Sequence, residues 1–157
     1  MKIEFTRGVL QIEDARITYK NFEGRGDKYN REGDRNFAVI IPTQEDADLL
    51  LDNGWNVKIK EPRDGYDEPF MYLPVKIKFN GRGPSAYVIS GNKPTRLNEE
   101  TIGMIDDIDI QSVNMDLRPY DWSVNGKEGR TAYLQAIEVI QNIDRFGAKY
   151  VEDGLPF

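Results

Sequence analysis

Cysteine and histidine are both absent from this 157-residue sequence. Without cysteine the chain can form no disulfide and no thiolate metal site, which fits a reducing compartment. Without histidine it lacks the commonest general base and the commonest transition-metal ligand. The two absences exclude a thiol nucleophile, a serine–histidine relay and a histidine-based zinc site.

Long apolar runs are missing as well. No run of about 18 apolar residues is present to cross a bilayer, and the N-terminal sequence MKIEFTRGVLQIED lacks the apolar core of a signal peptide. No stretch matches the phosphate-binding pattern GxxxxGK[ST]. We therefore expect a soluble, cytoplasmic protein with no membrane partner and no cofactor.

Positive charge is in deficit, because 21 Lys and Arg against 27 Asp and Glu leave a net charge of −6. This deficit counts against indiscriminate nucleic-acid binding, since counterion release requires local positive charge. Seven Phe, eight Tyr and two Trp argue against disorder, and the length suits one domain. We expect that domain over residues 1–143 and a flexible tail over 144–157, where periodicity is weak.

Short runs of alternating apolar and polar residues dominate the chain. They predict about seven strands, at 9–19, 37–41, 55–59, 75–79, 86–90, 108–117 and 131–141. The alternation changes parity near Asp14 and near Ser112, which indicates a bulge in each strand. Asn125–Gly126 predicts a tight hairpin turn before the last strand.

One helix is expected among these strands. Thr43 is its predicted N-cap, acids follow in its first turn, Leu49, Leu50 and Leu51 form its buried face, and Gly54 ends it. A single further helical turn is expected at 98–104, capped by Asn98. The fold class is therefore all-β with one short helix, and the two bends favour a closed barrel with long hairpin loops.

The sequence KNFEGRGDKYNREGDR, residues 20–35, separates the first two predicted strands. A loop this long in a compact domain is usually functional or disordered. Its cations could attract phosphates and its rings could stack on bases. The alternative is a solvated hairpin loop, because four acids offset most of the charge. The candidate binding residues here are Tyr19, Lys20, Phe22, Arg25, Lys28, Tyr29, Arg31 and Arg35.

Two predicted strands carry lysines in their outward rows, Lys58 with Lys60 and Lys76 with Lys78. Such rows on neighbouring strands would form a positive stripe, since strands lie about 4.8 Å apart. The late hairpin RPYDWSVNGKEGRTAY adds further binding candidates. The alternatives are lysines that only solvate the sheet and rings that pack beneath their own hairpin. The candidates of the hairpin are Tyr120, Trp122, Arg130 and Tyr133.

Three acids lie close together at Asp106, Asp107 and Asp109. Three carboxylates could hold Mg²⁺ for phosphodiester hydrolysis, which needs no histidine in a two-metal site. Asp107 and Asp109 share one strand face, however, whereas Asp106 lies on the other. We therefore expect a solvated acidic strand edge and no metal site, and a metal-dependent nuclease stays as an alternative.

The C-terminal residues Glu152, Asp153, Leu155, Pro156 and Phe157 resemble the acidic tip of bacterial single-stranded DNA-binding proteins. The runs ARITYKNF, WNVKIK, PVKIKF and GRTAYLQAIEVIQ are more similar to phage-encoded single-stranded DNA-binding proteins, which have an OB-fold and an acidic tail. In an OB barrel the helix usually lies between the third and fourth strands, whereas residues 43–53 here follow only two predicted strands.

This resemblance implies an OB-fold-like barrel, closed or partly open, that binds single-stranded DNA by base stacking and phosphate contacts with little sequence preference. It implies a role in DNA replication or recombination in the host cytoplasm, with partner proteins recruited through the C-terminal tip. It implies no enzymatic activity, and it leaves a homodimer open. A β-rich structural or protein-interaction module is the remaining alternative.

Overall fold

The computed structural model describes residues 1–62, 68–81 and 83–143, so the predicted tail lies outside the described residues. Among the described residues, no helix is both long enough and apolar enough to cross a lipid bilayer. The elements in chain order are β1 (Lys2–Thr6), β2 (Val9–Asn21), β3 (Arg35–Ile40), α1 (Gln44–Asp52), β4 (Lys58–Lys60), β5 (Phe70–Ile77), β6 (Ser85–Ser90), β7 (Lys93–Leu97), the 3-10 helix η1 (Ile102–Asp106), β8 (Ile110–Val124) and β9 (Lys127–Gln141).

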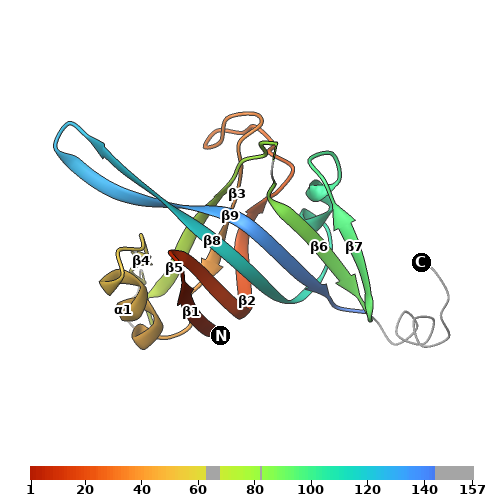
Figure 1. The fold of residues 1–157 in the computed structure, drawn as a ribbon, viewed down its shortest axis with the longest axis horizontal. Coiled ribbons are helices and arrows are strands. Elements are labelled where there is room, and N and C mark those ends of the chain that lie inside the picture. Colours follow the sequence, from red (N-terminus) through yellow and green to blue (C-terminus); the bar gives the residue numbers. More distant parts are fainter. Residues whose placement is uncertain (63–67, 82, 144–157) are drawn as a thin grey trace.

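Five strands close into a barrel (Figure 1). Antiparallel pairs join β5 to β3, β3 to β2, β2 to β8 and β8 to β9. The ring closes where β5 and β9 pair in parallel, with Val75 opposite Ala132 and Lys76 opposite Tyr133. The OB-fold is a five-stranded Greek-key barrel, so the predicted all-β, OB-like fold is confirmed.

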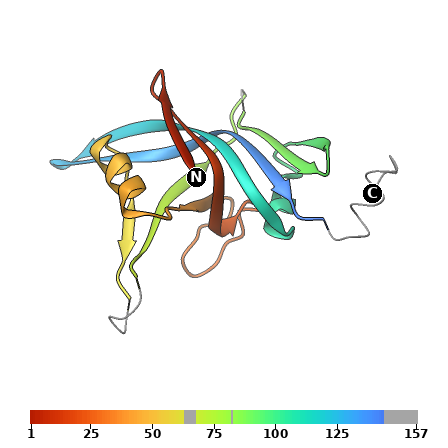
Figure 2. The ribbon, with the colours of Figure 1, turned by 90° about the horizontal axis from the view of Figure 1, so that it is seen from below.

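The other strands extend this barrel at its edges. β1 pairs with β2, β4 pairs with β5, and the β6–β7 hairpin joins β9 through a parallel β6–β9 pairing. Figures 1 and 2 show the β6–β7 hairpin at the opposite end of the molecule from α1 and β4. The alternation did not predict β1 or β7, because most side chains of both strands are exposed and show no buried row.

The predicted bulges and the predicted turn are confirmed. The β2–β8 register shifts between Ile12 and Ala15, where Asp14 has a φ of +54°, and the β8–β9 register shifts between Ile110 and Ser112. Bulges bend strands and increase their twist, which helps a sheet to close. Asn125 and Gly126 have φ values of +52° and +80°, as a type I′ hairpin turn requires. The hairpin of β8 and β9 extends well beyond the barrel (Figure 1).

Helix α1 lies between the second and third barrel strands, as the sequence indicated. Ala47 and Leu50 face the core, whereas Leu49 and Leu51 are exposed. The expectation of three buried leucines was wrong, because neighbouring helical residues point about 100° apart at about 3.6 residues per turn. The second helical element, η1, begins at Ile102, later than predicted, and Asn98 caps the turn before it.

Thr43 caps the N-terminus of α1. Its Oγ1 accepts a hydrogen bond of 3.1 Å from the backbone N–H of Asp46. We expect Thr43→Ala to lower the free energy of unfolding by about 1 kcal/mol, because an N–H of the first turn loses its partner. Urea denaturation measures the change, and Thr43→Ser, which keeps the hydroxyl, is the control. Equal stability of the alanine and serine variants would contradict this role.

The core is continuous inside the barrel. Leu10, Leu73, Val75, Val113 and Leu117 are among its fully buried side chains. Because side chains alternate along a strand, burying one row of each barrel strand leaves the other row facing outward. The candidate site must therefore be built from these outward rows and from the loops that join them.

Candidate nucleic-acid interface

The outward row of β5 is the central part of the candidate interface. Met71, Leu73, Val75 and Ile77 are buried, while the alternate residues face outward. These outward residues are Phe70, Tyr72, Pro74 and Lys76, with Lys78 just beyond the end of the strand. The sequence did not predict Phe70 and Tyr72 as binding residues. Both the buried and the outward positions of residues 70–74 are apolar or aromatic, so no alternation showed that the strand predicted at 75–79 begins as early as Phe70.

The two predicted lysine rows lie on neighbouring strands but not side by side. Lys58 pairs with Tyr72 and Lys60 pairs with Phe70 across β4 and β5. Directly paired residues share a face of the sheet, so these lysines flank the aromatic side chains of β5. Lys76 lies farther along β5 and Lys78 lies just beyond its end, so the two lysine rows follow one another along one face.

Tyr19, Phe70 and Tyr72 form the first aromatic cluster on this face, here called the Tyr72 cluster. The ring of Tyr19 lies edge-on to Phe70 and Tyr72, at centroid distances of 6.2 and 5.5 Å. Phe70 and Tyr72 are stacked at 5.6 Å. Tyr19 has a φ of +52° at a register shift in β2 and is 54% exposed. The cluster therefore presents ring surface to solvent next to Lys58 and Lys60.

Arg118, Tyr120 and Tyr133 form the second group, the Tyr133 cluster, on β8 and β9. The guanidinium of Arg118 lies 5.3 Å from the Tyr133 ring centroid, and Tyr120 meets the same ring edge-on at 6.0 Å. Tyr120 is 56% exposed. Because Tyr133 pairs with Lys76 on β5, the second cluster lies beside the second lysine row.

Trp122 lies on the same face of the β8–β9 hairpin, opposite Gly129. Its indole occupies the space that a Cβ at position 129 would need, so glycine there lets the ring lie flat on the ribbon. The indole therefore packs on its own hairpin in part, as the alternative interpretation held, and is still 38% exposed.

A cavity of about 410 Å³ lies between the Tyr133 cluster and the loop that joins β2 to β3. We call this loop, residues 22–34, the finger loop. The cavity is lined by Asn30 and Asp34 of the finger loop, by Lys76 on β5 and Lys78 just beyond it, and by Tyr133. The cavity thus brings together three regions that the sequence marked separately.

The finger loop carries most of the remaining predicted cations. Arg25, Lys28 and Arg31 are exposed, and Tyr29 is 88% exposed with the Lys28 ammonium 5.5 Å from its ring centroid. Two basic residues at the base of the loop are held by backbone carbonyls. Lys20 Nζ donates to Ile105 O, and Arg35 Nη1 donates to Glu99 O.

Phe22 does not belong to the interface. Its side chain is fully buried and stacks on Phe37 with a centroid distance of 5.0 Å. The prediction that Phe22 offers a ring to a base was therefore wrong. Phe22 follows directly after β2, and its orientation was ambiguous in sequence because the register shift after Thr18 changes which residues face the core.

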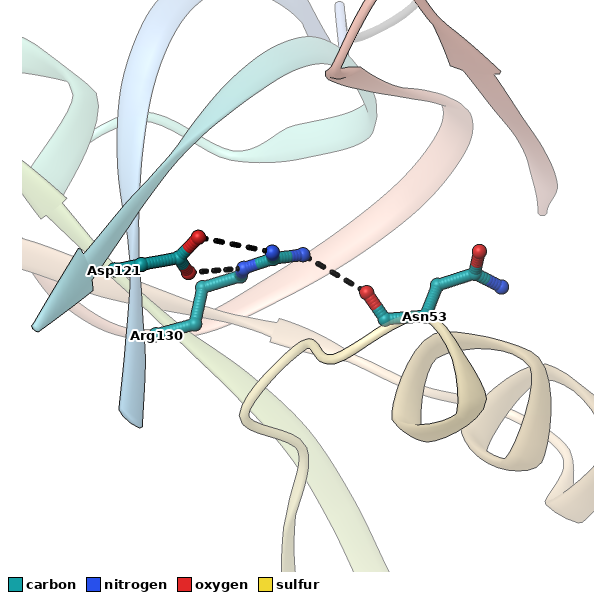
Figure 3. A network of polar contacts seen from close by, with 3 residues as sticks. All are labelled: Asn53, Asp121 and Arg130. Carbon is teal, nitrogen blue, oxygen red and sulfur yellow. Dashed lines mark hydrogen bonds and ion pairs between the residues drawn. The ribbon is translucent and has the colours of Figure 1, made fainter. Parts of the chain in front are cut away.

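Arg130 also faces away from the two clusters. Its guanidinium donates to both carboxylate oxygens of Asp121, at 2.6 and 3.1 Å, and to the backbone oxygen of Asn53 at 2.8 Å (Figure 3). It also lies over the ring of Trp55. These contacts tie the β8–β9 hairpin to the end of α1, and the DNA contact at Arg130 stays a prediction.

The Asp121–Arg130 pair gives a pH-dependent contribution to stability. Hydrogen bonds from Arg130 hold the pKa of Asp121 below its ordinary value of 3.8. A depressed folded-state pKa means that the contribution is present above the unfolded value and is lost as pH falls through the folded value. We expect Asp121→Asn to lower Tm slightly at pH 6, and the difference from wild type to shrink as the pH is lowered below the ordinary value of 3.8. A difference that stays constant with pH would contradict this assignment.

The predicted acidic cluster does not converge on one point. Both carboxylate oxygens of Asp106 accept backbone N–H groups, from Phe22 at 2.8 Å and from Glu23 at 3.0 Å. In the part of the chain that the structure describes, no three acidic side chains are grouped as metal ligands. The geometry therefore gives the nuclease alternative no support.

Comparison with known proteins identifies the family. No curated protein matches the sequence. The single-stranded DNA-binding protein of bacteriophage Enc34 has a similar fold, with a TM-score of 0.53 at 13% identity over 93% of each chain. Its complex with single-stranded DNA gives a TM-score of 0.51 at 11% identity, covering 88% of this chain and 89% of that one. Residues 2–157 match the family described as "Putative phage ssDNA-binding domain". The chain therefore belongs to the phage single-stranded DNA-binding domain family.

Proposed function

We propose that this protein binds single-stranded DNA along the outward face of β5, with little sequence preference and without catalysing a reaction on it. The observation that carries the proposal is the order of groups on that face. The Tyr72 cluster lies beside Lys58 and Lys60, and the Tyr133 cluster lies beside Lys76. The family match and the DNA complex of the Enc34 protein support the same function.

The spacing of the clusters suits an unpaired strand. Tyr72 and Lys76 are four residues apart on β5, or about 13 Å at about 3.3 Å per residue. One flexible strand can therefore reach both clusters, stacking bases on the rings while its phosphates meet the lysines. In a duplex the bases are already paired and stacked inside the helix, so their faces are unavailable. Stacking also tolerates any base, which accounts for the lack of sequence preference.

A binding titration tests the proposal directly. Fluorescence polarisation with labelled oligo-dT, and with a duplex of the same length, compares the two forms at several salt concentrations. We expect tight binding of the single strand, weaker binding of the duplex, and a clear salt dependence. Failure to bind oligo-dT at low salt would favour a structural or protein-interaction module instead. Cleavage of the strand with Mg²⁺ or Mn²⁺ that is lost in Asp107→Ala would favour a nuclease.

We further propose that the protein acts in phage DNA replication or recombination in the host cytoplasm, and that its C-terminal tip recruits partner proteins. The tip residues Glu152, Asp153, Leu155, Pro156 and Phe157 lie outside the described residues. Acidic side chains followed by an aliphatic residue, a proline and an aromatic ring suit an apolar pocket rimmed by arginine. Removing residues 154–157 should preserve or improve DNA affinity and abolish partner pull-down. The possible homodimer is checked separately by sedimentation equilibrium.

A further inference from the structure

Both ends of the finger loop are attached to one short segment, residues 99–106, which contains η1. On the β2 side, Lys20 Nζ donates to Ile105 O at 3.2 Å, and the Asp106 carboxylate accepts the backbone N–H groups of Phe22 and Glu23. On the β3 side, Arg35 Nη1 donates to Glu99 O at 2.7 Å. A segment distant in sequence thus sets where the loop leaves the barrel and where it returns.

Asp106 makes two of these attachments. Each of its oxygens accepts one backbone N–H, at 2.8 and 3.0 Å, and hydrogen bonds to an ionised carboxylate are about twice as strong as neutral ones. The two donors are consecutive, so the carboxylate orients the backbone at the point where the loop begins. The adjacent Phe22 side chain is buried, which holds the same point to the core.

The loop itself is a single hydrogen-bonded unit. Asn30 Nδ2 donates to the carbonyls of Arg25, Arg31 and Asp34, and Asn30 Oδ1 accepts from Asn36 Nδ2 on β3. The backbone N–H of Gly33 donates to Gly24 O across the loop. Because these bonds connect the two sides internally, an attachment at the base also determines the position of the tip.

We propose that Asp106 is a positioning residue for DNA binding, which holds the finger loop so that Arg25, Lys28 and Arg31 reach the phosphates of a strand on β5. This inference rests on the proposed function. The physical reason is preorganisation: a loop already ordered in the free protein loses less conformational entropy when the strand binds. Both carboxylate oxygens of Asp106 accept hydrogen bonds from the loop backbone. Asp106 thus affects DNA binding through the cations of the finger loop.

The direction of the change in DNA affinity when Asp106 is replaced distinguishes positioning from a simple electrostatic effect. Removing a negative charge from a nucleic-acid-binding surface should by itself tighten binding. Loss of positioning should instead weaken it. Asp106→Asn removes the charge and turns an amide donor toward a backbone N–H, so it breaks the attachment with little change of shape. Asp107→Asn, at the exposed neighbouring residue, is the matched control for charge alone.

The experiment is a double-mutant cycle with oligo-dT at several salt concentrations. The second arm replaces Arg25, Lys28 and Arg31 by alanine. In the wild-type background Asp106→Asn should weaken binding at least about twofold, the lower range for residues coupled in one network. It should also reduce the salt slope, by at most about 2 if three phosphate contacts at about 0.7 each are lost. In the triple-alanine background the same substitution should weaken binding no further.

Two further measurements keep the inference testable if Asp106→Asn is poorly folded. Hydrogen exchange of a peptide spanning 20–26 should be faster in Asp106→Asn than in Asp107→Asn. Asn30→Ala, which changes no charge, should reduce the salt slope in the same way. The inference would be overturned if Asp106→Asn bound oligo-dT as tightly as Asp107→Asn with an unchanged salt slope. It would also be overturned if Asp106→Asn lost the same affinity in the wild-type and triple-alanine backgrounds. If the wild-type protein itself fails to bind oligo-dT, the proposed function fails instead.

Discussion

Replacement of Tyr72 and Tyr133 by alanine together is expected to weaken oligo-dT binding at least about 30-fold. The two residues anchor the two aromatic clusters. A base stacked on an aromatic side chain contributes about 1–3 kcal/mol, so losing two such platforms removes about 2–6 kcal/mol of binding free energy. Because every base has an aromatic face, the loss should be similar for oligo-dT and oligo-dA.

Fluorescence polarisation at fixed salt measures this effect, and Tyr87→Ala is its matched control. Tyr87 lies on β6 beside a cavity lined by Glu13, Asp116 and Glu138, away from both clusters. Circular dichroism should show that the double variant keeps its fold. Affinity within about twofold of the Tyr87→Ala value would show that the strand does not lie across these clusters. The single variants Tyr133→Ala and Trp122→Ala should each give a smaller loss.

The second large effect is expected in the salt dependence of binding. Replacing Lys58, Lys60, Lys76 and Lys78 by alanine should make the plot of log affinity against log salt concentration less steep. Its slope should decrease in magnitude by at most about 2.8. This value follows from about 0.7 per phosphate contact on a single strand, because each neutralised phosphate releases condensed counterions. At low salt the affinity should fall strongly, while the stacking contribution from the ring clusters persists at high salt.

The control variant removes four positive charges elsewhere, at Lys2, Arg7, Lys93 and Arg96, which lie on β1, β7 and the β1–β2 turn. It lowers the net charge equally and so reports the general electrostatic effect. We expect its salt slope to stay close to the wild-type value. Equal slopes for the two quadruple variants would mean that net charge, not the path along β5, governs binding.

Local patterns predicted much of the fold because they act over a few residues. Parity changes located the bulges at Asp14 and Ser112, and Asn125–Gly126 located the hairpin. Thr43 marked the start of α1. Each of these signals depends on backbone preferences or on alternation within one segment, so none needs knowledge of the partner strand.

Local patterns were insufficient where a residue's environment depends on what it meets across the barrel. The buried position of Phe22 follows from packing against Phe37 on β3, and the ion pair of Arg130 follows from its pairing with Asp121 on β8. Phe70 and Tyr72 joined the interface because β4 pairs with them in a register that places Lys58 and Lys60 alongside. No local pattern specifies these pairings.

The amino-acid sequence alone determined the outward lysine rows, the basic loop, the absence of thiol and imidazole chemistry and the barrel-forming alternation. All of these reside in residue type and short-range spacing. The tertiary structure decided which rings and cations share one face, and it turned Asp106 from a candidate metal ligand into an attachment for the finger loop. The physical reason is that strand register and barrel closure join residues far apart in the chain, and only those long-range pairings set which side chains can act together.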